Sequence, residues 1–353
     1  MLYQIIDRMK ASVLEEYGKI SWKSIPDPKV NENDVLINVK FSNICGTDEH
    51  IFKGEFHPRT SLPLVMGHEL SGIVTDTGKK VRKCQLGDKV VVDPIIWCGE
   101  CAACKRGHHP ACSSLKLIGI DLDGGYAEYI SVPENMVYKV HDEISLRHAS
   151  LVEVLSIGFH ACNRAGVKEN DTVLIWGGGK LGQCILQAVK TKTNAQVFIV
   201  DILDERLQRA GNAYPDIVTI NPKLANPVQL IKEQTGGIDI AFEAVGHVEN
   251  VNNIPNPVRG CIQSIRGAGT VCVLGLADEP SPILMKELIW KEAKIIASRV
   301  SHGEYSETLS ALEKGTLKPE ALITKEMQMP DLQKAFSILE NEKKDHLKIL
   351  MEV

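Results

Sequence analysis

Four of the ten cysteines stand close together, with the spacing Cys98-x2-Cys101-x2-Cys104-x7-Cys112. Thiolates at this spacing are typical of a closed tetrahedral zinc site, in which every coordination position is filled and none remains for a substrate. Disulfide scaffolds are typical of short secreted chains, whereas this chain has 353 residues. The quartet therefore predicts a structural zinc site that holds together a segment with little apolar content of its own.

A second set of possible metal ligands is spread along the first half of the chain. Cys45 lies in ICGTDEH, His68 and Glu69 lie in MGHEL, and Glu153 lies in LVEVLSIGFHA. Any one of these residues alone is more typical of a packed core or of a surface. Three protein ligands with one open position would form a catalytic zinc site, and these residue types suit it.

A glycine-rich segment, Gly177-Gly178-Gly179-Lys180-Leu181-Gly182, directly follows the apolar run VLIW. It fits G-x-G-x-x-G at the end of a strand and the start of a helix. The glycines would allow a tight turn, a close approach of the backbone to a pyrophosphate, and close packing of helix on strand. The segment therefore predicts a dinucleotide-binding loop.

An acidic residue stands at the end of the next predicted strand. Asp201 lies 19 residues beyond Gly182, where a carboxylate can accept hydrogen bonds from both adenosine ribose hydroxyls and repel a 2′-phosphate. No arginine directly follows it, so the pattern favours NAD over NADP. Arg206, five residues further on, could also reach the adenosine ribose and is the residue that would weaken this preference.

Two kinds of element would position these residues. Residues 20–95 contain short β segments separated by glycine and proline, typical of a twisted, partly open barrel. From residue 172 onward, apolar strands alternate with helical stretches, which predicts a doubly wound parallel sheet. Pro255 and Pro257 break any single helix over Val248–Arg266. The six predicted strands are Thr172–Trp176, Ala195–Val200, Ile217–Ile220, Ile238–Phe242, Thr270–Leu274 and Lys294–Ala297.

Composition excludes several classes of function. The formal net charge is −5 and the sequence pI is about 6.1, which argues against a general binder of nucleic acid or membrane surfaces. No uninterrupted apolar stretch reaches the roughly 18 residues that a transmembrane helix needs. The charged N-terminal segment leaves no room for the core of a signal peptide. We therefore expect a cytoplasmic enzyme.

The motifs together resemble those of the zinc-dependent medium-chain dehydrogenase/reductase family. The resemblance rests on Cys45-Gly46-Thr47-Asp48, Gly67-His68-Glu69, the cysteine quartet and the glycine-rich segment, in the family's order and over nearly the whole chain. Within that family, LVEVLSIGFHACNRAG and ASRVSHGEY are similar to the polyol, or sorbitol-type, dehydrogenase branch. This implies an oxidoreductase that oxidises a secondary alcohol to a ketone with NAD.

The resemblance also implies an architecture. A GroES-like, β-rich catalytic domain would comprise residues 1–156 and 297–353, and a Rossmann NAD-binding domain would comprise residues 157–296. The active site would lie in the cleft between them. Each chain would hold two zinc ions, one catalytic and one structural, and the protein would be a homo-oligomer, either a dimer or a tetramer.

The ligand roles follow from the same resemblance. Cys45, His68 and Glu69 would ligate or flank the catalytic zinc, and Glu153 would be a fourth ligand or would hold the zinc-bound water. Asp48 would pair with His68 and fix the tautomer of its ring. The alternative for Glu153, from the sequence alone, is a cap of the following helix.

The remaining implied roles concern the substrate. Thr47 would hydrogen-bond the substrate oxygen, His50 would end a proton relay to solvent, and Arg299 would face a hydroxyl-rich or anionic substrate. The candidate substrates are polyols, sugar acids, sugar phosphates and cyclitols. The branch often has an aromatic residue where this chain has Ile51, and a proline where it has Val154.

Two alternatives stay open. One is an L-threonine-type amino-alcohol dehydrogenase, which also uses zinc and keeps the quartet; LVEVLSIGFHA favours the polyol branch over it. The other is a non-catalytic relative that binds a dinucleotide. Such a relative should have lost the catalytic ligands, whereas Cys45, His68 and Glu69 are all present.

Overall fold

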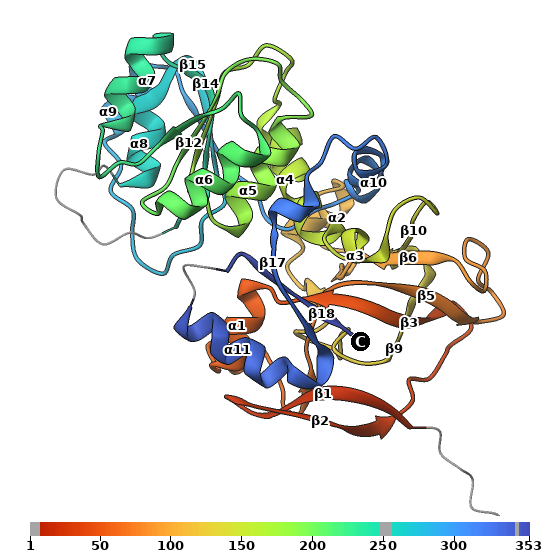
Figure 1. The fold of residues 1–353 in the computed structure, drawn as a ribbon. Helices are drawn as coiled ribbons and strands as arrows, with labels where there is room; N and C mark the ends of the chain where they lie inside the picture. Colours follow the sequence, from red (N-terminus) through yellow and green to blue (C-terminus); the bar gives the residue numbers. More distant parts are fainter. Residues whose placement is uncertain (1–7, 247–255, 343–345) are drawn as a thin grey trace, which may run out of the picture. The chain divides into compact units, whose positions relative to one another are not determined.

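The structure is a computed structural model that describes residues 8–246, 256–342 and 346–353 (Figure 1). The chain divides into two compact units. The first unit comprises Met1–Glu153, Thr308–Glu313 and Ile323–Val353, and the second comprises Val154–Glu307 and Lys314–Leu322. The second unit is therefore inserted in the chain of the first.

The first unit is built from three sheets of short strands. One has the order β2-β1-β4, the main seven-stranded sheet has the order β10-β6-β5-β3-β18-β17 with β9 also paired to β3, and β7 pairs with β8. Its strands are β1 (Arg8–Glu16), β2 (Lys19–Pro26), β3 (Asp34–Asn43), β4 (Leu64–Val65), β5 (Glu69–Thr77), β6 (Lys89–Val92), β7 (Ile95–Ile96), β8 (Lys116–Leu117), β9 (Tyr129–Pro133), β10 (Val137–Lys139), β17 (Ile323–Gln328) and β18 (Lys348–Glu352).

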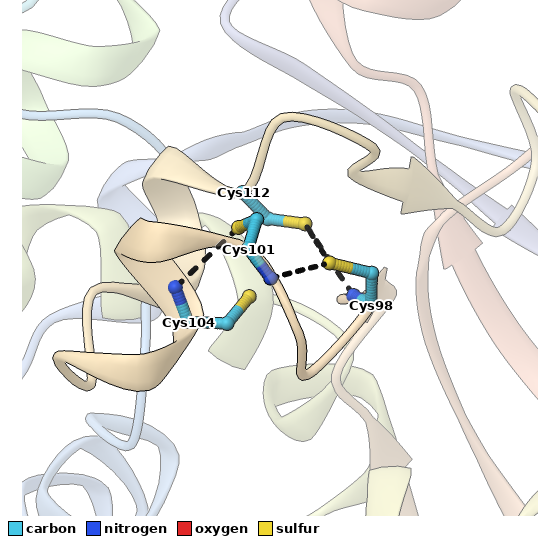
Figure 2. Close-up of side chains that lie close together, drawn as sticks. All are labelled: Cys98, Cys101, Cys104 and Cys112. Atoms are coloured by element: carbon cyan, nitrogen blue, oxygen red, sulfur yellow. Dashed lines mark hydrogen bonds between the residues drawn. The ribbon is translucent and has the colours of Figure 1, made fainter.

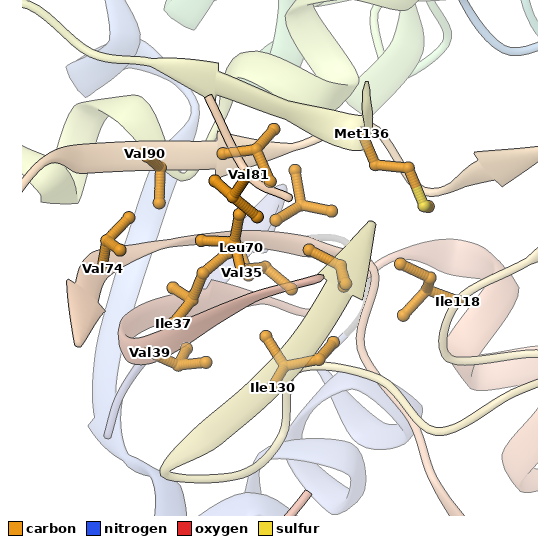
Figure 3. Packing of buried hydrophobic residues seen from close by; sticks show 13 residues of the cluster. Val35, Ile37, Val39, Leu70, Val74, Val81, Val90, Ile118, Ile130 and Met136 are labelled. Carbon is orange, nitrogen blue, oxygen red and sulfur yellow. The ribbon is translucent and has the colours of Figure 1, made fainter. Parts of the chain in front are cut away.

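The core of this unit follows from the two-residue period of its strands. Val35, Ile37 and Val39 alternate along β3, so their side chains point to the same face of the sheet and are fully buried. Figure 3 shows them packed with Leu70 of β5 and Ile130 of β9. Burying each such side chain contributes about 1.5–3 kcal/mol relative to leaving it in water. This core holds β3 and β5 in fixed register, and both strands lead to candidate ligands.

The second unit is a six-stranded parallel sheet with the order β13-β12-β11-β14-β15-β16, flanked by helices (Figure 1). All four residues of β11 are buried, as expected for a strand covered on both faces. The predicted six-stranded parallel sheet is confirmed. Its strands are β11 (Val173–Trp176), β12 (Val197–Val200), β13 (Val218–Ile220), β14 (Ile238–Glu243), β15 (Ile265–Val273) and β16 (Lys294–Ala297).

The helices alternate with these strands, as the sequence pattern predicts. Helix α8 begins at Pro257, whose missing N–H is tolerated in a first turn. The rest of the stretch Val248–Arg266, where we predict that no single helix forms, lies partly outside the described residues. The helices of this unit are α5 (Lys180–Val189), α6 (Asp204–Ala213), α7 (Pro227–Thr235), α8 (Pro257–Ser264) and α9 (Met285–Ile289).

The remaining helices lie in the first unit or cross between the units in sequence, except for the 3₁₀ turn Pro319–Ala321, which lies in the second unit. They are α1 (Gly46–Phe52), α2 (Ala102–Lys105), α3 (Leu146–Ala149), α4 (Val152–Ala165), α10 (Tyr305–Glu313), α11 (Leu332–Asn341) and the 3₁₀ turns His109–Ala111, Glu134–Met136, Pro319–Ala321 and Met329–Asp331. Among the described residues, no helix combines the length and the apolar character that crossing a bilayer would require.

Candidate active site

Three candidate ligands meet in the first unit. The donor atoms of Cys45, His68 and Glu69 all lie within 4.8 Å of one another. Strand pairing brings them together: Asn43 at the end of β3 is paired with Glu69 at the start of β5. Cys45 follows two residues after Asn43, at the N-cap of α1. The antiparallel register therefore places the thiol beside the imidazole and the carboxyl.

Asp48 lies beside the imidazole of His68. Asp48 Oδ1 lies 3.5 Å from His68 Nδ1, and both side chains are buried. Burial alone would lower the pKa of His68, but the charges of Asp48 and Cys45 outweigh it and hold that pKa well above its ordinary value. Burial would raise the pKa of Asp48, yet the His68 charge and the Cys45 N–H hydrogen bond lower it overall. Asp48 thus faces Nδ1 as a carboxylate, which leaves Nε2 as the nitrogen available to a metal.

Glu69 is held from the other end of the chain. Lys348 Nζ in β18 donates a hydrogen bond to Glu69 Oε1, and the two side chains are 1% and 0% exposed. The second oxygen, Glu69 Oε2, is buried and has no hydrogen-bond partner. A buried carboxylate oxygen without a partner is costly in a protein interior.

These residues fit a zinc ion. A thiolate, an imidazole and a carboxylate are all common zinc ligands, and a cation near them would satisfy the orphaned Glu69 Oε2. Three protein ligands would leave a fourth position for a substrate. Cys45, His68 and Glu69 are therefore the residues that would hold the metal.

Glu153 lies in the first turn of α4 and is 6% exposed. Among the described residues, the group within 4.8 Å contains Cys45, His68 and Glu69 but not Glu153. Burial, followed by the negative charge of Glu69, raises the pKa of Glu153 to about 8, although His68 and Lys348 act in the opposite direction. The protonation of Glu153 therefore depends on the charge of the cluster. A cation bound by Cys45, His68 and Glu69 would favour the ionised form of Glu153.

The two proposed proton-relay residues lie on α1. Thr47 is half-buried and follows Cys45 by two residues. His50 is exposed, and its Nδ1 is hydrogen-bonded to a carboxylate oxygen of Glu55. The helix thus carries one hydroxyl close in sequence to the thiol ligand and one imidazole in contact with solvent.

The cysteine quartet forms a second cluster, between β7 and β8 (Figure 2). Its four sulfurs lie within 4.8 Å of one another, with Cys98 Sγ and Cys112 Sγ 3.5 Å apart. Zinc–thiolate bonds of about 2.3 Å in a tetrahedron place sulfurs about 3.8 Å apart. The quartet thus has the size of a closed tetrahedral zinc site.

Backbone N–H groups stabilise the thiolate form of one cysteine of this cluster, Cys101. The N–H of Cys104 donates to Cys101 Sγ at 3.5 Å and, together with other donors, lowers the pKa of Cys101 to about 5. Burial raises the pKa of Cys104 to about 12, with the neighbouring Cys101 thiol adding to the shift. Four thiolates this close repel one another unless a cation is present, so the cluster fits a structural zinc ion.

The glycine-rich loop connects β11 to α5 in the second unit. Gly177 has φ of +112°, and a Cβ there would lie 2.8 Å from Val245 Cγ2. A Cβ on Gly182 would lie 1.7 Å from Gly177 O. These two glycines are required by packing inside the protein, whereas a Cβ on Gly179, the N-cap of α5, would have only the Arg206 guanidinium within 4 Å. That open side and the N-terminus of α5 fit a pyrophosphate.

Asp201 stands beside this loop because β11 and β12 are parallel neighbours, with Trp176 paired to Val200. Asp201 Oδ2 accepts hydrogen bonds from the N–H of Gly178 at 2.7 Å and from Arg206 Nη1 at 3.4 Å. Asp201 Oδ1 accepts a hydrogen bond from the N–H of Leu203 at 2.9 Å. A carboxylate offers about four lone pairs, so one acceptor site on Oδ1 remains for a ribose hydroxyl. The structure thus places the acidic residue and the arginine at one point beside the loop.

The other proposed binding residues lie in the second unit. Lys180 and Leu181 are half-buried in the first turn of α5. Arg299 is exposed and follows the buried Ser298. The next residue, Val300, has φ of +48°, a strained conformation for a β-branched residue.

The sequence analysis does not predict two residues that contact the metal cluster or its partners, Lys348 and Tyr126. Lys348 is the single charged residue inside the apolar run LKILM, which is a detectable signal for a buried ion pair. Tyr126 donates a hydrogen bond to Asp48, and nothing in its spacing from the ligands indicates this contact.

Comparison with known proteins identifies the family to which the chain belongs. Residues 31–142 match the alcohol dehydrogenase GroES-like domain, and residues 181–314 match the zinc-binding dehydrogenase family. The chain is 30% identical to the L-threonine 3-dehydrogenase of Bacillus velezensis, over 94% of this chain and 96% of the relative. Dehydrogenases of polyols and sugar acids are also among its relatives. The sorbitol dehydrogenase of Bacillus subtilis is 26% identical over 99% of each chain.

Solved structures have the same fold. An alcohol dehydrogenase of Escherichia coli CFT073, RspB, complexed with NADH, superposes with a TM-score of 0.88 at 28% identity, covering 98% of this chain and 99% of that one. The predicted combination of a GroES-like domain with a Rossmann domain is thereby confirmed. The chain belongs to the zinc-type alcohol dehydrogenase family, the medium-chain dehydrogenases that bind zinc, and it is an oxidoreductase with polyol dehydrogenases among its relatives.

Proposed function

We propose that this enzyme oxidises a secondary alcohol of a polyol, sugar acid, sugar phosphate or cyclitol reversibly to a ketone, with NAD as hydride acceptor. The observation that carries the proposal is the cluster of Cys45, His68 and Glu69, with donor atoms within 4.8 Å and one buried carboxylate oxygen lacking a partner. That cluster suits a catalytic rather than a closed metal site, because three ligands leave one position open.

The chain's own residues have distinct tasks in this reaction. Zinc, when bound, supplies a Lewis acid that polarises the substrate hydroxyl. Thr47 hydrogen-bonds that hydroxyl and passes its proton towards His50, whose ring is exposed and paired with Glu55. Asp48 keeps His68 in one orientation. We assign Glu153 to the metal site, where it would either be a fourth ligand of the zinc ion or hold a water molecule beside it.

The cofactor is bound by the second unit. The pyrophosphate binds at the N-terminus of α5, beside Gly179, Lys180 and Leu181. Gly177 and Gly182 shape this loop by allowing its turn and its close packing. Asp201, oriented by the N–H of Gly178, accepts the adenosine ribose hydroxyls, and Arg206 contacts the same ribose. NADH in the related RspB structure supports this assignment. Arg299 is assigned to the substrate, for which an exposed guanidinium suits hydroxyl-rich or anionic groups.

The threonine-type alternative keeps its own support, since the L-threonine 3-dehydrogenase is 30% identical to this chain. A substrate panel separates the two. NADH formation is followed with sorbitol, other polyols, sugar acids, sugar phosphates, cyclitols and L-threonine, each with NAD. Oxidation of a polyhydroxy compound supports the proposal, and turnover of L-threonine alone would replace it with an amino-alcohol dehydrogenase.

Metal analysis tests the site independently of the substrate. The protein should contain two zinc ions per chain, and Cys45→Ser should remove one of them together with activity. Cys84→Ser is the matched control, since Cys84 is half-buried and belongs to neither cluster. Full activity in Cys45→Ser would overturn the catalytic assignment.

We also propose that the protein forms a homo-oligomer, in which its partner is a second copy of the chain. Strand β16 is at the edge of its sheet, and Ile295 on it is 39% exposed. The preceding helix α9 and its C-cap residue expose Met285, Ile289 and Trp290, at 62%, 70% and 79%. An apolar edge strand of this kind suits antiparallel pairing with its own copy. Light scattering of the wild type should find an oligomer. The double variant Ile289→Ser with Trp290→Ser should shift it towards monomer, whereas the control Leu86→Ser should leave the oligomer unchanged.

The domain boundaries at residues 156 and 297 and a cytoplasmic location stay predictions.

A further inference from the structure

Tyr126 is completely buried beside the candidate metal cluster, although it contributes no ligand to it. Its hydroxyl lies 2.7 Å from Asp48 Oδ2 and 3.2 Å from the carbonyl oxygen of Asn43. A hydroxyl has one proton, and a carboxylate is the stronger acceptor at the shorter distance. The tyrosine therefore donates to Asp48.

This hydrogen bond sets the rotation of the Asp48 carboxylate. Oδ2 accepts from Tyr126 and, at 2.9 Å, from the N–H of Cys45. With Oδ2 held by two donors, Oδ1 faces His68 Nδ1 at 3.5 Å. The same carboxylate thus contacts the backbone of one proposed ligand and the ring of another, and Tyr126 is its remaining anchor.

The tyrosine also supports the chain just before His68. A Cβ on Gly67 would lie 2.5 Å from Tyr126 Cδ1, so the ring packs directly on this backbone. The backbone next to the ring is fixed as well, because the N–H of Tyr126 donates to the carbonyl of Met66 at 3.0 Å and that of Gly125 donates to the carbonyl of Gly67 at 2.8 Å. The ring of Tyr126 therefore supports the backbone before His68, and its hydroxyl holds the carboxylate that faces the His68 ring.

We infer that Tyr126 is a positioning residue for the catalytic metal site, holding the Asp48 carboxylate so that His68 presents Nε2 to the zinc ion. The inference rests on the proposed function, because it concerns the metal held by Cys45, His68 and Glu69. A phenylalanine could fill the same space on Gly67, but it could not donate to Asp48. The hydroxyl, not the ring, is therefore the part that the inference concerns.

The test compares Tyr126→Phe with wild type as purified holoenzymes. Zinc transfer to an excess of a chromogenic chelator is followed in time, and the quartet zinc serves as the internal reference in every sample. The fast phase, assigned to the catalytic zinc, should accelerate roughly 10-fold in Tyr126→Phe, the lower end of the range for lost partners of metal ligands. The slow phase from the quartet should not change. Tyr129→Phe removes a hydroxyl three residues further along the chain, on β9, and should leave both phases unchanged.

A double-mutant cycle isolates the route through Asp48. In an Asp48→Asn background the oriented charge is absent, so removing the Tyr126 hydroxyl should alter the fast phase by less than about twofold. An unchanged fast phase in Tyr126→Phe, with at most a lower melting temperature, would make Tyr126 a packing residue and overturn the inference. A wild-type protein that holds only the quartet zinc would overturn the proposed function instead, and the number of phases in wild type separates these two failures.

Discussion

Lys348, in the last strand, donates a hydrogen bond to Glu69, a proposed metal ligand 279 residues earlier in the chain. Both side chains are buried. The chain's C-terminal strand is thereby connected to the candidate metal site, because β18 pairs with the end of β3 that leads to Cys45. The buried ammonium compensates the charge of Glu69 at one oxygen and leaves the other oxygen to the cluster.

Replacing Lys348 with methionine should destabilise the zinc-depleted protein. The substitution keeps most of the side-chain volume but leaves Glu69 buried without its cation, and breaking a buried pair in this way costs about 3–5 kcal/mol. Denaturant unfolding followed by tryptophan fluorescence measures the change. Lys334→Met, on the exposed face of α11, is the control and should change the free energy of unfolding by less than about 0.5 kcal/mol. Equal midpoints for Lys348→Met and wild type would show that the pair does not contribute to stability.

The parts of the fold that the sequence predicts are those with local patterns. The cysteine quartet spans fifteen residues, and the glycine-rich loop directly follows its strand, so spacing alone identifies both. Residue types make Cys45, His68 and Glu69 candidate ligands, but only the family resemblance assigns them to one zinc site. Their proximity depends on the antiparallel pairing of β3 with β5, which spacing in the sequence does not reveal. Contacts such as Tyr126 with Asp48, 78 residues apart, depend on tertiary packing that periodicity does not encode.

Cys104→Ser should remove the structural zinc while the catalytic zinc remains. Cys104 is buried in the quartet, and three remaining thiolates close the site less well. We expect zinc content to fall from two ions to one per chain and the melting temperature to fall as well, since structural zinc contributes directly to folding. Cys162→Ser, at another buried cysteine outside both clusters, should keep two zinc ions. Retention of both ions by Cys104→Ser would argue against the quartet as a zinc site.

Asp201 should make the enzyme discriminate against NADP. The ribose 2′-phosphate would face a buried carboxylate, so kcat/KM with NADP should be lower by roughly two orders of magnitude or more. Asp201→Asn should narrow this gap, because Arg206 then stands beside the ribose without an opposing charge. Asp204→Asn, an exposed change in the next helix, is the control. Equal use of both cofactors by the wild type would reverse the roles assigned to Asp201 and Arg206.

Glu153 should make the stability of the zinc-depleted protein depend on pH. Burial and the charge of Glu69 raise its pKa to about 8, whereas in the unfolded chain its pKa is near the ordinary value of 4.5. A raised carboxyl pKa stabilises the folded state fully below the unfolded pKa, and this contribution is lost as pH rises towards the folded pKa. Wild type and Glu153→Gln should therefore have similar unfolding free energies near pH 5. At pH 8.5 the variant should be the more stable by more than about 1 kcal/mol.

In the zinc-loaded enzyme the same substitution should instead impair turnover. A cation at Cys45, His68 and Glu69 favours the ionised form of Glu153, and removing a charged partner of a metal site usually costs 10- to 100-fold. Removal of one negative charge makes the site more cationic, so the acidic limb of the kcat profile should move to lower pH. The exposed Glu143→Gln is the control and should change neither the stability profile nor turnover. If Glu153→Gln lowers only the melting temperature and leaves the kcat profile in place, Glu153 only stabilises the first turn of α4. The sequence similarity around it then gives no support to a role at the metal.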